Sequence, residues 1–303
     1  MERRILMSFK SGFISIIGRP NAGKSTLINR LVEQKIAIVS EKAQTTRDAI
    51  IGVRTTEESQ LIFIDTPGIH KPKHQLGDRM NQASYAHFKG VDLIYYIIDG
   101  NEPFGKGDQF VLDRLKTVKL PIYLLINKVD QMTKDDILEK IVQFSDYNFT
   151  EIIPISALQD DNIDKLLELS LGLMEEGPMF YPKDQVSAYP EQFIYAEIIR
   201  EKILKLTEQE IPHSVAVTIE RIVKKKGSTL IDAVILVDRD SQKGMVIGKQ
   251  GSMLKKIGTM ARGELETMIG EPVFLQSYVR VEKNWRNRAK MLNQLGYVET
   301  EYE

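Results

Sequence analysis

Apolar runs alternate with helical patterns through the first half of the chain. Short runs rich in Ile, Val, Leu and Tyr occur at 13–18, 49–55, 60–65, 91–99, 121–127 and 151–156. Between them, apolar residues recur every three to four positions, which predicts helices near 24–34, 76–89, 107–118, 134–145 and 161–175. This alternation is typical of a doubly wound α/β sheet with helices on both faces.

The second half has a different pattern. A helical stretch at 191–208 precedes strand patterns at 215–222, 230–237 and 273–281, and helical patterns lie between the last two strands. This order predicts a smaller α+β domain. A proline-punctuated stretch separates it from the first half and favours a linker over a regular element. We therefore expect domains at 1–176 and 191–303, joined by a linker at 177–190.

Composition narrows the class of protein. The chain has 303 residues, 42% hydrophobic and 27% charged, and no cysteine, so disulfides and thiolate metal sites are excluded. No secretory signal is visible, and no apolar run approaches the ~18 residues of a membrane span. The net charge of −1 hides an asymmetry, because fifteen Lys and Arg stand against seven Asp and Glu between Arg221 and Lys290. A basic partner surface is therefore expected in the last third of the chain.

The residues from Gly18 to Ser25 fit the phosphate-binding pattern G-x-x-x-x-G-K-[ST] between a strand and a helix. The glycines bring backbone N–H groups close to a polyphosphate, and the helix directs its positive end at the same anion. Lys24 can reach the outer phosphates, and the Ser25 hydroxyl suits Mg²⁺. An ordinary strand-to-helix turn is the alternative. We expect the nucleotide to contact Gly18, Arg19, Pro20, Asn21, Ala22, Gly23, Lys24, Ser25 and Thr26.

An aspartate follows the strand at 60–65. Asp65 begins the turn that ends at Gly68, at the carboxyl end of a strand, where ligands bind in doubly wound sheets. Asp65 can hold Mg²⁺ through a water, and the Gly68 N–H can meet a γ-phosphate. Alone, this tetrapeptide would usually be only a turn. Its position after a phosphate-binding loop favours the nucleotide-binding interpretation.

Two further loops follow strands and can recognise a base. Asp130 can accept two hydrogen bonds from the adjacent donors of guanine, whereas adenine offers one donor and one acceptor. Asn127 can tie this loop to the phosphate loop, and the Lys128 stem can cover the base. The next strand ends at Ser156, Ala157 and Leu158, where the Ala157 N–H can donate to the guanine carbonyl.

Together these motifs make residues 13–175 resemble the small GTPases of the translation-factor-related class. The resemblance implies GTP and GDP binding, Mg²⁺-dependent hydrolysis, and a first switch at 43–48 in which Thr46, or else Thr45, ligands the metal. The expected metal ligands are Ser25, Thr46 and Asp65. The expected catalytic residues are Lys24, Thr46, Asp65, Gly68 and Asn21.

Two residues suggest how hydrolysis is stimulated. Ile69 stands where many GTPases have a glutamine that orients water, so slow intrinsic hydrolysis is expected. Asn21 resembles the asparagine that holds K⁺ in related GTPases, where the ion would supply positive charge to the transition state. Two alternatives stay open: Asn21 only caps a turn of the loop, or the positive charge comes from Arg47 of the switch or from a ribosomal partner.

A G-x-x-G sequence at Gly248 to Gly251 is the main motif of the second half. It follows Val-Ile and leads into a basic helical pattern, an arrangement typical of the KH loop that clamps single-stranded nucleic acid. The order of elements resembles the second KH topology. The lysine run at 224–226 fits a solvated hairpin tip or an RNA phosphate contact equally well. The expected RNA-binding residues are Gly248, Lys249, Gln250, Gly251, Lys255, Lys256 and Arg262.

A GTPase domain followed by such a domain resembles the Era family of bacterial ribosome-assembly GTPases. The resemblance implies binding of the single-stranded 3′ end of small-subunit ribosomal RNA and a role in assembly of the small ribosomal subunit. We expect a cytoplasmic protein, with peripheral association at the inner face of the cell membrane left open. Two alternatives remain: a second domain that binds a protein or membrane through the basic helix after Trp285, and an RNA-binding module whose nucleotide is structural.

Overall fold

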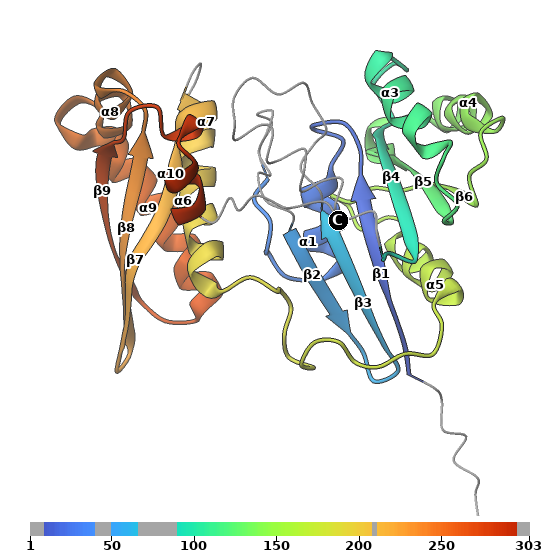
Figure 1. Cartoon of the computed structure of the whole chain (residues 1–303), viewed down its shortest axis with the longest axis horizontal. Coiled ribbons are helices and arrows are strands. Elements are labelled where there is room, and N and C mark those ends of the chain that lie inside the picture. The colour runs from blue at the N-terminus through green and yellow to red at the C-terminus, as the bar shows by residue number, and fades with distance from the viewer. Residues whose placement is uncertain (1–8, 40–49, 66–89, 208–210, 296–303) are drawn as a thin grey trace, which may run out of the picture.

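The structure is a computed structural model that describes residues 9–39, 50–65, 90–207 and 211–295 (Figure 1). Several predicted features lie outside these ranges. They are the first switch at 43–48 with Thr45 and Thr46, the turn residue Gly68, Ile69, and the helix at 76–89.

The first part of the chain contains a mostly parallel sheet. Within the described ranges its strand order is β2-β3-β1-β4-β5-β6, and only β2 is antiparallel to its neighbour. The strands are β1 Lys10–Ile17, β2 Ile50–Thr55, β3 Ser59–Asp65, β4 Leu93–Asp99, β5 Ile122–Asn127 and β6 Glu151–Pro154. The predicted doubly wound fold is confirmed. Chain order reverses beside β1, so the loop after β1 lies where such sheets bind ligands.

Helices cover both faces of this sheet. Along β4, Tyr95 packs into the core shared with α1 (Lys24–Leu31) and α5 (Ile163–Leu173), while Tyr96 packs into the core shared with α3 (Lys106–Leu115) and α4 (Lys134–Phe144). Successive strand residues point to opposite faces, and both faces of β4 are buried, which explains its continuous apolar sequence.

Left-handed residues set two helix ends that differ from the prediction. Helix α1 ends at Leu31 rather than near 34, and Glu33 just beyond it has φ 58°. Helix α5 begins at Ile163 rather than at 161, because Asn162 before it also has φ 58°. Helix α4 begins where predicted, since the Thr133 hydroxyl accepts from the Asp136 N–H at 3.2 Å and Asp136 accepts in return from the Thr133 N–H.

The second part is a smaller α+β unit with the predicted order of elements. Strands β7 (Ala216–Lys225) and β8 (Ser228–Val237) are antiparallel, and β9 (Val273–Val281) pairs in parallel with β8. Helices α6 (Glu191–Leu206), α8 (Asp240–Ile247) and α9 (Ser252–Ile269) bury one face of this sheet; the short helix α7 (Ile211–Ser214) follows α6. The predicted fold of this half is confirmed as well.

Two element boundaries in this half differ from the prediction. Strand β7 runs to Lys225 rather than ending at 222, so the exposed lysine run forms the end of the strand and the hairpin turn, where Lys224 pairs with Glu191 at 3.2 Å. The basic helix predicted from Trp285 to Lys290 is divided into a 3-10 turn at Trp285–Asn287 and a helix that begins at Ala289. Trp285 is fully buried, and its indole N–H donates to the Ser214 carbonyl at 3.0 Å; the helix α10 (Ala289–Gln294) follows later.

The stretch at 177–190 contains no helix, but it is tied to the first sheet. Ser187 forms an antiparallel bridge with Gly52 of β2, and the Val53 N–H donates to the Val186 carbonyl at 2.9 Å. The side chain of Gln60 accepts from the backbone N–H groups of Phe180 and Tyr181. This stretch therefore lies along the sheet edge rather than hanging free as a linker.

A second tie joins the two parts of the molecule. Lys35, in the segment after α1, pairs with the fully buried carboxylate of Glu201 on α6 and with Glu264 on α9. Ile38 of the same segment packs into the core of the second part, and Asn29 accepts from the Ile36 and Ala37 N–H groups to fix the segment. The segment that precedes the first-switch residues is thus anchored on the second part.

None of the helices within the described ranges is long and apolar enough to cross a bilayer.

Candidate nucleotide and RNA sites

The loop after β1 has the backbone geometry that a phosphate site requires. A Cβ on Gly18 would lie 2.3 Å from the Ile97 carbonyl oxygen, and one on Gly23 would lie 2.1 Å from Nδ2 of Asn127. Gly23 also has φ 103°, which favours glycine. Ser25 and Thr26 lie in the first turn of α1, so the positive end of this helix points into the loop.

Lys24 lies inside the loop. Its ammonium is buried and donates to the carbonyls of Gly18 at 3.1 Å and Arg19 at 3.2 Å. Burial lowers the pKa of Lys24, and the carboxylate of Asp65 opposes this shift only in part. An anion with several negative charges would replace the weak carbonyl acceptors with a much stronger partner.

Two of the three predicted metal ligands lie together. The Ser25 hydroxyl donates to Oδ2 of Asp65 at 3.3 Å, and Asp65 is fully buried at the carboxyl end of β3. A hydroxyl and a carboxylate are hard oxygen donors of the kind that Mg²⁺ prefers. The residues present therefore fit this metal, while the third predicted ligand, Thr46, lies outside the described ranges.

Asn127 connects three motifs that are distant in sequence. Its Nδ2 donates to the Ala22 carbonyl of the phosphate loop at 2.8 Å, and its Oδ1 accepts from the Ala157 N–H at 3.0 Å. The first bond is the tie that the sequence indicated. The second differs from the expectation that the Ala157 N–H serves the guanine carbonyl: because Asn127 ends the neighbouring strand β5, its side chain takes this donor. The N–H of Leu158 is the next one along the loop.

The predicted base-recognition residues lie beside Asn127. The buried Ser156 hydroxyl donates to Oδ1 of Asp130 at 2.6 Å, which orients the carboxylate. Lys128 has φ 68°, and its ammonium pairs at 2.5 Å with Asp99 at the end of β4. The sequence analysis missed Asp99, although its position after a buried strand is the same signal that identified Asp65.

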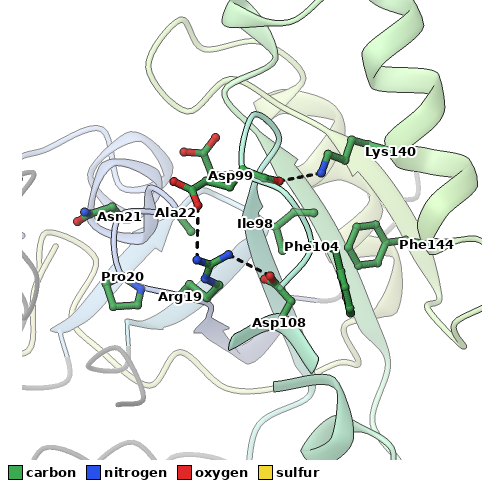
Figure 2. Close-up of a pocket in the computed structure, with 11 residues that line it drawn as sticks. Arg19, Pro20, Asn21, Ala22, Ile98, Asp99, Phe104, Asp108, Lys140 and Phe144 are labelled. Atoms are coloured by element: carbon green, nitrogen blue, oxygen red, sulfur yellow. Dashed lines mark hydrogen bonds and ion pairs between the residues drawn. The ribbon is translucent and has the colours of Figure 1, made fainter. Parts of the chain in front are cut away.

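Arg19 and Asn21 point in different directions from the phosphate loop. Arg19 pairs with Asp108 of α3 at 3.0 Å and with Glu102 at 3.4 Å, and Figure 2 shows it reaching toward Asp108 while Asn21 points the other way. Asn21 is exposed and has φ 66°. Asp108 also accepts from the hydroxyl of Tyr96, whose pKa is raised by burial and by the carboxylate. The Arg19 side chain therefore braces the loop rather than facing the phosphates.

A cavity of about 270 Å³ opens beside this brace. It lies between the phosphate loop, the end of β4 and α4, with Pro20, Phe104 and Phe144 among its lining residues (Figure 2). It adjoins the nucleotide site and carries no separate cluster of unpaired charges in the part of the chain that the structure describes.

The G-x-x-G loop lies between α8 and α9 of the second part. Gly248, Gln250 and Gly251 all have positive φ, and a Cβ on Gly248 would lie 2.8 Å from the backbone nitrogen of Met253. The side chains of Lys249 and Gln250 are exposed at the tip. The loop can therefore approach another backbone closely. The predicted basic residues of α9, all exposed, are Lys255, Lys256 and Arg262.

Comparisons with known proteins bear on both sites. Residues 13–128 match the family model described as 50S ribosome-binding GTPase, and residues 210–286 match that of the KH domain. A crystal structure of a variant of Aquifex aeolicus Era bound to GDP·AlF4⁻ is similar with 38% identity and a TM-score of 0.91. So is a structure of Era in complex with MgGDPNP and nucleotides 1506–1542 of 16S ribosomal RNA, with the same identity and TM-score. In both comparisons the similarity covers 95% of this chain and 99% of the other.

Proposed function

This chain belongs to the Era family, and on that basis we propose that it is a Mg²⁺-dependent GTPase that binds the single-stranded 3′ end of small-subunit ribosomal RNA and acts in assembly of the small ribosomal subunit. Residues 1–176 form the GTPase domain, 177–190 connect it, and 191–303 form the KH domain. We place the protein in the cytoplasm, because its proposed partner, the small ribosomal subunit, is assembled there.

The observation that carries the GTPase assignment is the pair of hydrogen bonds made by Asn127. They join the phosphate loop, at Ala22, and the loop after β6, at Ala157, to the same side chain. A nucleotide bound here has its phosphates at Lys24 and its base at Asp130. Asp130 accepts from the two guanine donors, and the Leu158 N–H, in place of that of Ala157, donates to the guanine carbonyl.

Hydrolysis requires charge stabilisation around the phosphates. Ser25 and Asp65 would hold Mg²⁺, together with Thr46, and the metal would neutralise charge on the phosphate oxygens when bound. Lys24 contributes a buried positive charge, and the N–H groups of the loop donate to the same oxygens. Gly68 completes the site as the donor to the γ-phosphate.

The RNA assignment is supported by the shape and charge of the second part. The strained G-x-x-G backbone lets an RNA strand approach, and Lys249, with the α9 residues Lys255, Lys256 and Arg262, supplies phosphate contacts. Binding should therefore weaken steeply with salt. The membrane alternative is not carried forward, since Trp285 of the stretch on which it depended is buried and Arg286 pairs with Asp238 at 2.6 Å.

Potassium is the proposed source of the missing positive charge. Asn21 is exposed at the edge of the phosphate loop, and its side-chain oxygen is a hard acceptor suited to an alkali cation. Phosphate release should be faster in KCl than in NaCl at equal ionic strength. Asn21→Gly tests this better than Asn21→Ala, because glycine tolerates the observed φ of 66°. The glycine variant therefore removes the side chain without straining the backbone, as alanine would. If the glycine variant keeps the stimulation by K⁺, Asn21 does not hold the ion.

The whole function can be tested by separating its two activities in one protein. Lys24→Ala should abolish phosphate release and leave binding to a 3′-end RNA at wild-type strength. Lys249→Asp with Gln250→Asp should do the reverse, since the acidic side chains repel the RNA backbone while the GTPase domain is untouched. Loss of both activities in either variant, or of neither, would contradict the assignment.

A further inference from the structure

The KH sheet exposes two aromatic rings on the face opposite helices α6, α8 and α9. In β9 the odd-numbered Leu275 and Val279 pack into the helix-side core, so Phe274 and Tyr278 point to the opposite face. Their exposed fractions are 63% and 59%, against 46% for Phe110 on α3. Two exposed rings on one face of a strand form a platform on which nucleic-acid bases can stack.

The strand pairing shows which residues surround these rings. Phe274 lies beside Leu230 of β8 and Tyr278 beside Val234, while between them Gln276 lies beside Asp232. Strand β7 adds Arg221, whose guanidinium pairs with Asp232 at 2.7 Å. Along β9 the open face therefore presents a ring, a polar row and a second ring, and Arg280 beside Leu236 follows. Its basic residues are Lys225, Arg221, which pairs with Asp232, and Arg280, which pairs with Glu220 at 3.1 Å.

Within the part of the chain that the structure describes, a group of side chains covers one end of this face. Trp285 and Leu292 pack on Ala216, Val234 and Leu236, near the carboxyl end of β8. This cover buries Ala216, Val234 and Leu236 in a small core. The part around Phe274 and Gln276 is left exposed.

This pattern fits nucleobases better than an apolar protein surface. A protein dock would need a continuous apolar patch, but Gln276 and the Arg221–Asp232 pair separate the two rings. Rings four residues apart on a strand are roughly 13 Å apart, far enough for each to stack on a different base. Basic side chains beside the rings can meet the phosphates, and polar groups between them can meet base edges.

The face also adjoins the proposed clamp. Strand β9 is an edge strand, and both α8 and α9, which flank the G-x-x-G loop, pack against it. Figure 1 shows α8 at the end of the sheet where β8 terminates. A single-stranded RNA held by the G-x-x-G loop thus needs only to pass over the edge strand β9 to reach the open face.

We propose that this open face is a second contact for single-stranded RNA, at which Phe274 and Tyr278 stack on two bases of the strand that the G-x-x-G loop clamps. The proposal rests on the proposed RNA binding and extends it to a surface on the other side of the sheet. It predicts that affinity rises with RNA length beyond what the loop alone can hold.

The experiment compares two RNAs from the 3′ end of small-subunit ribosomal RNA. One has about four nucleotides, the length that a KH loop clamps, and the other about twelve, long enough to reach β9 as well. Dissociation constants are measured for the wild type, Phe274→Ala, Tyr278→Ala and the double variant. Tyr278→Phe keeps the ring, and Phe110→Ala removes a comparably exposed ring from the GTPase domain.

Each ring removed should weaken the longer RNA by at least about fivefold and leave the shorter RNA unchanged. Tyr278→Phe and Phe110→Ala should bind both RNAs as the wild type does. Because stacking releases no counterions, the salt dependence should also stay the same in the ring variants. Ultraviolet cross-linking of the longer RNA should attach it to the peptide that contains residues 273–280.

Two results would overturn the proposal. One is an unchanged affinity of the double variant for the longer RNA, together with no cross-link on β9. The other is an equal loss for both RNAs, which would mean that the rings support the fold or the clamp. If instead the wild type fails to bind either RNA, the proposed function itself fails, and the two failures are thereby distinguished.

Discussion

Replacing Asp130 by asparagine tests how the site selects its base. In the structure the Ser156 hydroxyl donates to Oδ1 of Asp130 at 2.6 Å. The same bond will hold the amide oxygen of Asp130→Asn at that position, so the amide NH₂ will replace Oδ2 and face one of the two guanine donors. One acceptor contact is then replaced by a donor-to-donor repulsion, and the other is made by a neutral oxygen in place of a charged one.

The expected loss follows from the two hydrogen bonds. A hydrogen bond to a charged group contributes about 1.5–3 kcal/mol, so two contribute about 3–6 kcal/mol. Because Asp130 is an exposed residue of its loop, we expect the lower end, about 3 kcal/mol or roughly a hundredfold in Kd. Xanthine nucleotides present an acceptor to the new NH₂ and should bind this variant better than the wild type.

Calorimetric titration with GDP and XDP measures both effects. Ser156→Ala is the matched control, because it removes the orienting hydroxyl and keeps the carboxylate. It should weaken GDP by about 1 kcal/mol without creating a preference for xanthine. Unchanged GDP affinity in Asp130→Asn, or a hundredfold loss with no gain for XDP, would refute the assignment of the base.

Three further predictions concern the loop and the tie between the two parts. Burial lowers the pKa of Lys24, and a bound polyphosphate would raise it again, so GTP affinity should fall as pH rises toward 10.5. Over the same range the free energy of unfolding of the nucleotide-free protein should rise, because the unfolded state holds the Lys24 proton longer. A GTP affinity that does not change with pH would contradict this. Gly23→Ala should abolish nucleotide binding in a filter assay, because Gly23 has φ 103° and the new Cβ would collide with the Asn127 side chain. The control Gly172→Ala places its Cβ where no atom lies within 4 Å, so this variant should bind nucleotide normally and unfold at the same or a higher temperature. Lys35→Ala should lower the free energy of unfolding by about 1–3 kcal/mol near pH 7, because it removes a partner of the buried Glu201. Burial acts to raise the pKa of the Glu201 carboxyl, but hydrogen bonds from Lys205 and Lys35 hold that pKa below its ordinary value, so the difference in stability from the wild type should shrink as acid protonates Glu201. Identical denaturation curves at pH 7 would argue against this ion pair as a tie between the two parts.

The nucleotide site could be predicted because its residues follow strands. In a mostly parallel sheet the carboxyl ends of the strands meet at one edge, so residues far apart in sequence, such as Ser25, Asp65 and Asn127, are brought together by the fold class alone. The glycine pattern was informative for a similar reason, since Gly18 and Gly23 occupy positions where a Cβ would collide with neighbouring atoms. Asp99 obeys the same rule and could have been included.

Contacts outside this logic could not be predicted. Lys35 and Glu201 lie in different parts of the chain, and no local pattern marks either residue as a partner of the other. Trp285 stands in a basic stretch that indicated a surface helix, but its ring fills the small core on the open face of the KH sheet. Oδ1 of Asn127 accepts a hydrogen bond from the Ala157 N–H because the two loops pack closely together. The spacing of the two residues along the sequence does not reveal this packing.

The most direct test of the account is to identify the RNA bound in cells. The wild-type chain and the variant with Lys249→Asp and Gln250→Asp are each cross-linked to cellular RNA, and the attached RNA is sequenced. For the wild type, reads should accumulate at the single-stranded 3′ end of small-subunit ribosomal RNA, and the variant should lose this peak while retaining GTP hydrolysis. Wild-type reads spread without preference over cellular RNA, or a 3′-end peak that persists in the variant, would contradict the account.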